Sequence, residues 1–219
     1  MKNIIILVAL LIFASCKNEK IKGVNLKKQL IEVLDTIYLD DQSIRLQFFD
    51  DLKKYGQKSD EFRATVIAMN KQDSINIIKI EKILDTYGWL GEDIIGKNGN
   101  LTLFLGIQHA KLSVQEKYLP MLREAVKNKN AKPSQLALLE DRVAMRNGKK
   151  QIYGSQTKID DKTGKNYFAP IKDPENVDIR RAKVGLPPMA EYAKMFDITW
   201  DINEHKIMSQ KLNSKKSNQ

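Results

Sequence analysis

Three polar side chains interrupt an otherwise apolar helical pattern in the stretch "LGIQHAKLSVQEKYLP", residues 105–120. At about 100° per residue, Gln108 and Gln115 fall inside the apolar stripe that begins at Leu101, and His109 lies at its edge. A buried amide without a hydrogen-bond partner costs about 1–3 kcal/mol. The pattern therefore indicates either a polar network with ordinary partners or the wall of a ligand pocket.

A second polar pair lies in the apolar stripe of the first long helical pattern. Asp41 and Arg45 are four residues apart, which places them at ion-pair distance on one helix face. A histidine can act as a general acid–base when a carboxylate orients its ring, and Asp41, Asp141 and Glu116 are the candidates for that role beside His109. Taken singly, these groups also have structural explanations, as an intrahelical ion pair and a hydrogen-bonded core histidine.

Several reaction classes are excluded by what the sequence lacks. It contains no glycine-rich dinucleotide or phosphate loop, no GxSxG motif, and a single cysteine, Cys16. The two histidines, His109 and His205, do not have metal-ligand spacing, so no metal site and no cofactor are predicted. The sequence favours a protein that binds a polar or anionic ligand. The alternative is a hydrolase-type enzyme with His109 as general acid–base and Asp141 as a catalytic candidate.

The N-terminal residues predict export and lipid attachment. "MKNIIILVALLIFASC" has one lysine, a short apolar run and two small residues before Cys16, which is typical of a signal peptide over residues 1–15. The junction resembles the lipobox of bacterial lipoproteins, in which the cysteine receives acyl chains that attach the protein to a membrane. We expect Cys16 to be lipidated, residues 16–23 to form a tether, and Lys17 to favour the outer membrane of a Gram-negative cell envelope.

The remaining chain predicts one domain of ordinary size over residues 24–196, followed by a polar tail over residues 197–219. Hydrophobic residues make up 42% of the chain, and its net charge is +10. Residues 127–150 contain seven basic and two acidic side chains, which indicates a solvated basic face or a surface for anionic headgroups. No nucleic-acid partner is expected for an exported lipoprotein, and the sequence leaves the oligomeric state open.

Helical spacing of apolar residues predicts a mainly α-helical fold. The expected helices are Val24–Tyr55, one that starts at Ser59 or Asp60, one from Asp73–Ser74 to Gly88, one from Asn100 through a kink at Pro120 to Val126, one over 133–147, one over 173–185, and a short one after Pro188. The segments "QIYGSQTKI" and "KNYFAPI" flank the turn cluster "DDKTG" and predict a β-hairpin. The predicted fold is a single helical domain with one small β-hairpin in its C-terminal third.

The hairpin carries polar residues of its own in the motif "QIYGSQ". In an extended strand Gln151 and Tyr153 point to one face, and Gly154 permits a bulge that redirects Gln156. Two amides and a phenol beside a glycine suit hydrogen-bonded recognition of a polar ligand. The alternative is that these side chains brace the loops of the hairpin itself.

The order of several short motifs resembles an uncharacterised bacterial family, domain of unknown function 6624. The motifs are "GWL", "QHA" followed by Gln115, "LEDR", "QIYGSQ" and "RRAKVGL", and the likeness extends from about Leu26 to Phe196. The resemblance implies that the following positions belong to the recurring pattern of the family: Gln108, His109, Asp141, Arg142, Gln151, Tyr153, Gly154, Gln156 and Arg181. The sequence departs from that pattern at Leu90 and Ser155, where proline and threonine are frequent. The resemblance implies a shared fold and shared pocket residues, but it brings no activity, substrate or cofactor.

Together the motifs predict one polar pocket, in which the glutamines and His109 face Asp41 and the hairpin. An arginine would supply charge for an anionic ligand. The predicted ligand-binding residues are Asp41, Arg45, Gln108, Gln115, Arg142, Gln151, Tyr153, Gln156 and Arg181, with His109 and Asp141 as catalytic candidates.

Overall fold

The computed structural model describes residues 23–160 and 163–216 of the chain. The predicted signal peptide, Cys16 and the tether up to residue 22 lie outside the described residues, so lipid attachment stays a prediction. The chain forms two compact units, Met1–Ala110 and Lys111–Gln219, called unit 1 and unit 2 below. In the part of the chain that the structure describes, no helix combines the length and the apolar character needed to cross a bilayer.

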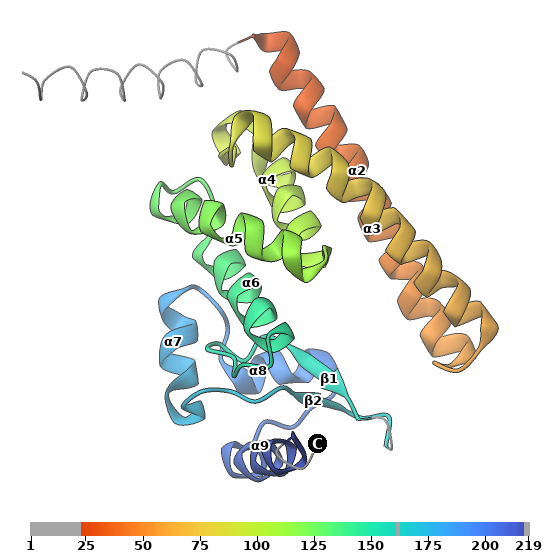
Figure 1. Ribbon diagram of the computed structural model, residues 1–219, viewed down its shortest axis with the longest axis vertical. Helices are drawn as coiled ribbons and strands as arrows, with labels where there is room; N and C mark the ends of the chain where they lie inside the picture. Colours follow the sequence, from red (N-terminus) through yellow and green to blue (C-terminus); the bar gives the residue numbers. More distant parts are fainter. Residues whose placement is uncertain (1–22, 161–162, 217–219) are drawn as a thin grey trace, which may run out of the picture. The chain divides into compact units, whose positions relative to one another are not determined.

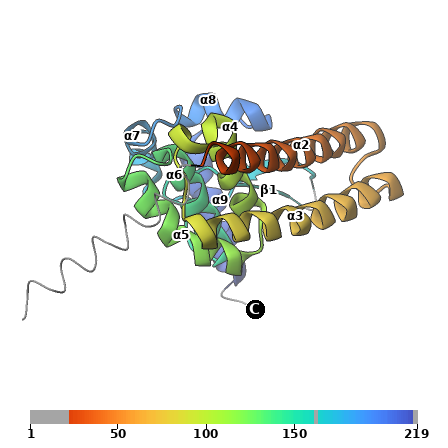
Figure 2. The same cartoon turned by 90° about the horizontal axis from the view of Figure 1, so that it is seen from above.

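Unit 1 is built on two long antiparallel helices, α2 (Val24–Tyr55) and α3 (Asp60–Tyr87), which run side by side in both views (Figures 1 and 2). The predicted bounds of the first helix are confirmed. Gly56 ends α2 with a φ of 82°, and the Ser59 hydroxyl caps α3 by accepting a hydrogen bond from the Phe62 amide at 3.1 Å. Leu34 and Ile37 on α2 and Ile80 and Leu84 on α3 are among the buried aliphatic side chains of this unit.

The predicted break at Asp73–Ser74 is wrong, because α3 runs through both residues without interruption. Ser74 does not cap a new helix. Its hydroxyl donates to the Asn70 carbonyl one turn earlier, at 2.8 Å, which is how a serine is accommodated in a helix interior. Asp73 forms an ion pair with Arg45 on α2, so a contact between helices explains its presence within α3.

Helix α4 (Glu92–His109) packs against both α2 and α3 and begins earlier than predicted. Gly96 interrupts its regular geometry with a φ of 73°. Asn100 lies inside the helix and does not cap it, because its side-chain amide donates to the Leu90 carbonyl at 2.8 Å. At Gly106 a β-carbon would collide with the end of the Ile80 side chain, so the absence of a β-carbon lets α3 and α4 approach closely without moving Ile80.

The predicted single helix from Asn100 to Val126 is also wrong, because the chain leaves helical geometry after His109. Ala110 is extended (φ −68°, ψ 171°), and the next helix, α5, starts anew at Leu112. Gln108 and Gln115 therefore lie on different helices in different units, although both are buried. The shared helical wheel that placed them on one stripe does not apply.

Unit 2 contains shorter helices and the predicted β-hairpin (Figure 1). Its elements are α5 (Leu112–Lys127, with Pro120 inside), α6 (Pro133–Arg146), β1 (Thr157–Ile159), β2 (Asn166–Phe168), the 3-10 turn η1 (Pro174–Asn176), α7 (Val177–Lys183), α8 (Met189–Ala193), the 3-10 turn η2 (Lys194–Phe196) and α9 (Ile202–Lys216). The strands are antiparallel, with Lys158 opposite Tyr167. Phe168, Ile171 and Met189 are part of the buried cluster behind them.

Two parts of unit 2 differ from the expectation. The motif "QIYGSQ" is not an extended strand but an irregular loop before β1, in which Gln151 forms an isolated bridge with Ile171. Gly154 has a φ of 67°, and a β-carbon there would come within 2.6 Å of the Ile171 side chain, so the loop requires glycine on two grounds. The segment expected as a polar tail carries helix α9, on which His205 is buried.

Candidate acid–base site

The structure brings His109 and Asp41 together in unit 1. Nδ1 of His109, the last residue of α4, lies 2.8 Å from Oδ1 of Asp41 on α2. Because an ionised carboxylate can only accept, Nδ1 carries the proton of the neutral ring, and Nε2 keeps its lone pair. The His109 side chain is 18% exposed, whereas that of Asp41 is 5% exposed. The buried carboxylate of Asp41 thus orients the imidazole, which remains partly exposed to solvent.

Asp41 is itself held from both sides. The Gln42 amide donates to its Oδ2 at 2.7 Å, and Nη1 of Arg45 lies 3.0 Å from its Oδ1, as the spacing of four residues predicts. Burial raises the pKa of Asp41. The hydrogen bonds from His109 and Gln42, and the positive charge of Arg45 and of His109 when it is protonated, outweigh burial and hold the pKa below its ordinary value. Asp41 therefore stays ionised beside the imidazole at neutral pH.

Arg45 is bound by a second carboxylate that the sequence-based prediction missed. Its Nη2 donates to both oxygens of Asp73 on α3, at 2.9 and 3.1 Å. Arg45 therefore joins α2 to α3 and is already neutralised by its own unit, which argues against the predicted role of Arg45 as an anchor for an anionic ligand. The position of Asp73 within a helical pattern could have indicated a polar contact between helices. The Asp73–Ser74 pair, however, is also typical of the start of a helix, and the sequence-based prediction interprets it in that way.

The same cluster contains atoms of the kind that bind metal ions. Asp41, Asp73 and His109 each offer one ligand atom, and these atoms lie within 4.8 Å of one another. Arg45 lies 3.0 Å and 2.9 Å from the two carboxylates and supplies the positive charge that a cation would supply. A metal ion would have to displace both this guanidinium and the proton on Nδ1 of His109.

Asp141 has a different environment in unit 2. Its carboxylate, on α6, accepts backbone hydrogen bonds from Ile152 at 2.7 Å, Tyr153 at 3.0 Å and Ser155 at 2.9 Å. Burial raises the pKa of Asp141, and these donors oppose the increase. The side chain is fully buried, so its hydrogen bonds hold the loop 151–156 and are not directed at a ligand.

The two loop glutamines are used in the same way. The side-chain NH2 group of Gln151 donates to the main-chain carbonyls of Gln156 at 2.9 Å and Ala169 at 2.8 Å. Its side-chain oxygen accepts from the main-chain N–H of Gln156 at 2.6 Å. The Gln156 side chain donates to the Ser155 hydroxyl at 2.9 Å. Both side chains are buried, and these contacts match the alternative in which they brace the hairpin. Their predicted ligand-binding role stays a prediction.

Arg181 also supports the loop. Its Nε donates to the Pro187 carbonyl at 2.6 Å and its Nη1 to the Tyr153 carbonyl at 2.7 Å, while its guanidinium lies 4.6 Å from the Tyr192 ring centre. Arg181 is fully buried, and Tyr153 and Arg142 are half-buried. Each unit therefore has a polar grouping of its own. A pocket shared by His109, Gln108, Gln115 and the hairpin stays a prediction.

Comparison with known proteins identifies a family. Residues 26–204 match the model described as "Family of unknown function (DUF6624)", and the chain belongs to this family. The resemblance inferred from the motifs is thereby confirmed, and the match ends eight residues beyond the predicted limit at Phe196. Neither the search of curated proteins nor the search of solved structures found a match.

Proposed function

We propose that this protein is a cell-envelope lipoprotein whose unit 1 carries a histidine acid–base site acting on a polar ligand. The observation that carries the proposal is the 2.8 Å contact between Nδ1 of His109 and Oδ1 of Asp41. A buried, ionised carboxylate that fixes the tautomer and orientation of a partly exposed imidazole is the arrangement that prepares a general base.

The reaction class that fits this arrangement is hydrolysis by an activated water. Nε2 of His109 would take a proton from water as its oxygen attacks an electrophilic carbon or phosphorus. The imidazolium, stabilised by Asp41, would then return the proton to the leaving group. Arg45 and Asp73 would act as positioning residues, because Arg45 bonds both carboxylates and so fixes Asp41 against the ring.

Ligand binding without chemistry is the second candidate. In the part of the chain that the structure describes, no serine, threonine or cysteine is bonded to His109, so the site contains no protein nucleophile in contact with the ring. Such a site would use Nε2 of His109 as a hydrogen-bond acceptor for a polar ligand.

The test uses the full-length protein purified from membranes and a panel of ester, amide, glycoside and phosphoester substrates together with envelope extracts, with products followed by mass spectrometry. We expect turnover of at least one class, lost in His109→Ala and reduced about 100-fold or more in Asp41→Asn. Retention of an extract molecule without turnover, abolished in His109→Ala, would favour the binding candidate. If the protein shows no turnover and no His109-dependent retention of a molecule, both candidate functions are contradicted.

Attachment to the membrane has its own test. Lipid attachment is expected because the "FASC" junction follows a short apolar run. Cys16→Ala should abolish metabolic labelling with acyl chains and release the protein from the outer-membrane fraction, where Lys17 after the cysteine is expected to direct it. Unchanged acyl labelling, or recovery of the wild-type chain from the inner membrane alone, would contradict this part of the proposal.

A further inference from the structure

A groove lies along the seam of α2 and α3, apart from the acid–base site. Its cavity has a volume of about 550 Å³, within the range of about 300–1,000 Å³ that is usual for small-molecule sites. The α2 residues that line it recur every three or four positions and so share one helix face. The lining consists of Leu26, Gln29, Leu30, Val33 and Thr36 from α2 and Lys79, Lys82, Ile83, Thr86 and Tyr87 from α3.

The wall of this groove offers mainly apolar surface. Leu30 and Ile83 are buried, while Val33 keeps 40% of its surface exposed although it is aliphatic. The hydroxyls of Thr36 and Thr86 are already bonded to carbonyl oxygens of their own helices, at 2.9 and 2.6 Å. They therefore need no partner from a ligand, and an apolar chain can cover them without leaving a donor unpaired.

The charge of the groove has one sign. Lys79 and Lys82 are its charged lining residues, both are exposed, and neither has an ion-pair partner within residues 23–160 and 163–216. They stand three residues apart on α3, so their ammonium groups can reach the same anion. An apolar trough with two free ammonium groups complements a molecule that has one apolar chain and an anionic head.

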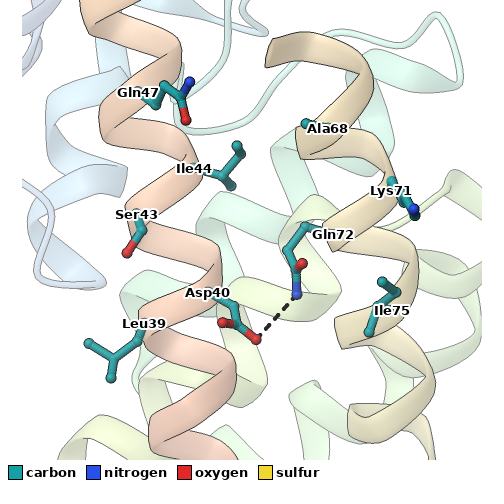
Figure 3. A pocket seen from close by; sticks show the side chains of 9 residues that line it. All are labelled: Leu39, Asp40, Ser43, Ile44, Gln47, Ala68, Lys71, Gln72 and Ile75. Atoms are coloured by element: carbon teal, nitrogen blue, oxygen red, sulfur yellow. Dashed lines mark hydrogen bonds between the residues drawn. The ribbon is translucent and has the colours of Figure 1, made fainter. Parts of the chain in front are cut away.

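A second cavity, farther along the same helix pair, has a different lining. It has about 540 Å³ and is lined by polar groups from both helices, including Asp40, Gln72 and Lys71. In Figure 3 the side chains of Asp40 and Gln72 point toward one another across the seam, joined by a hydrogen bond of 3.2 Å. An acyl chain there would have to desolvate a carboxylate, which is unfavourable.

The short segment between Cys16 and the groove would keep the groove close to a source of such molecules, the membrane. Leu26 stands ten residues after Cys16, and ten residues span at most about 35 Å. If Cys16 is lipidated, as the proposed function holds, the groove stays within about one bilayer thickness of the membrane surface. The acyl chains of the bilayer are therefore within reach of the groove.

We propose that this groove binds a long-chain fatty acid, with its carboxylate at Lys79 and Lys82 and its chain between α2 and α3. The test is photo-crosslinking in cells that produce the full-length protein, with a palmitate analogue that carries a diazirine and an alkyne. Tandem mass spectrometry should place crosslinks on the peptides that contain residues 26–36 and 79–87. Label on the Cys16 peptide reports acyl attachment separately, so the anchor and the groove can fail independently.

Two pairs of variants make the test specific. Val33→Asp places a charge in the groove and should lower crosslinking there at least fivefold, whereas Ile67→Asp, an equivalent change at a 69% exposed position outside the groove, should not. Lys79→Gln with Lys82→Gln should lower labelling by the acid probe at least threefold but leave a matching long-chain alcohol probe unchanged. The exposed pair Lys53→Gln with Lys71→Gln is the control.

If Val33→Asp impairs folding, Thr36→Trp at the exposed rim of the groove serves as the blocking variant. Crosslinks that map outside the two groove peptides would overturn the proposal. Equal labelling of the groove in wild type and the blocking variant, or an equal loss in the Ile67→Asp control, would overturn it as well. Unchanged acid-probe labelling in the double lysine variant would overturn the assignment of an anionic head.

Discussion

The polar cluster around His109 in unit 1 and the one around Asp141 in unit 2 are bonded in different ways. In unit 1 the groups of this cluster bond to side chains on other helices, as Asp41 does with His109 and Arg45 does with Asp73. In unit 2 they bond mainly to the main chain, as Asp141 and Gln151 do with the loop 151–156. A side chain that satisfies backbone groups cannot leave them without a folding penalty. A partly exposed imidazole held by one hydrogen bond, by contrast, can also bond to a ligand. The difference separates a structural network from a candidate site.

The largest effect on stability is expected at Asp141. Asp141→Ala removes the acceptor of three backbone N–H groups, of which that of Ser155 is buried and those of Ile152 and Tyr153 are partly buried, and a buried donor left unpaired costs about 1–3 kcal/mol. We expect a loss of at least about 3 kcal/mol in the free energy of unfolding, measured by urea denaturation. The neighbouring Glu140→Ala, which breaks an ion pair with the exposed Arg123, should cost less than about 1 kcal/mol. Similar losses in both variants would break the comparison.

His205 gives unit 2 a pH dependence of similar size. Its Nε2 accepts the Ile171 amide N–H at 3.2 Å, and burial, with the charge of Lys150, lowers its pKa from 6.5 to about 4. Because the unfolded chain binds the proton more tightly, stability is complete above about pH 6.5 and declines as the pH falls toward 4, by roughly 3 kcal/mol.

Unfolding free energies at pH 7 and pH 4.5 in wild type and His205→Gln test this dependence. The variant should lose the part of the pH dependence that lies between about pH 6.5 and 4. An identical pH profile in the two proteins would show that the histidine is not held neutral by the fold.

A smaller effect on stability is expected at His109, where the effect on function should be large. His109→Ala removes one hydrogen bond, but Asp41 keeps Gln42 and Arg45 as partners. We therefore expect a loss of no more than about 1.5 kcal/mol in unfolding free energy, together with loss of turnover or ligand retention. Thermal unfolding and the extract assay on the same preparation check both parts. A loss of several kcal/mol would assign His109 to the structural class.

The smallest effect is expected in the basic segment. Lys129, Lys132 and Lys149 are exposed, and exchanging all three for glutamine should change the unfolding free energy by less than about 1 kcal/mol. Loss of a cooperative melting transition would show that these side chains support the fold of unit 2.

The sequence was sufficient for features that depend on local spacing. The bounds of α2, the approach of Arg45 to Asp41, the hairpin and the mainly helical fold follow from periodicity, capping and turn residues. Ser59, one of the two residues expected at the start of α3, caps that helix. The break at Ala110 could not be predicted, because neither glycine nor proline marks it and the residues on both sides fit a helix.

The hydrogen-bond partners of the polar side chains could not be predicted from local sequence patterns either. Gln151 and Asp141 have the same hydrogen-bonding capacity whether they face a ligand or a loop, and only the tertiary fold determines which groups come near them. Asp73 was missed for the related reason that its partner, Arg45, lies 28 residues away on another helix. The pairing of His109 with Asp41, by contrast, was among the expected alternatives, since both lie in apolar stripes of long helices.

One matched pair of variants tests the distinction between the two units most directly. Asp41→Asn and Asp141→Asn make the same isosteric change, one in each unit, and both can be followed by urea unfolding and by the substrate and extract assay. We expect Asp41→Asn to stay within about 2 kcal/mol of wild type, since Arg45 retains Asp73, and to lose turnover or ligand retention. Asp141→Asn should lose at least about 3 kcal/mol, because an amide donor would face backbone donors. Severe destabilisation by Asp41→Asn with function retained in its folded fraction, or a stable Asp141→Asn, would contradict the account.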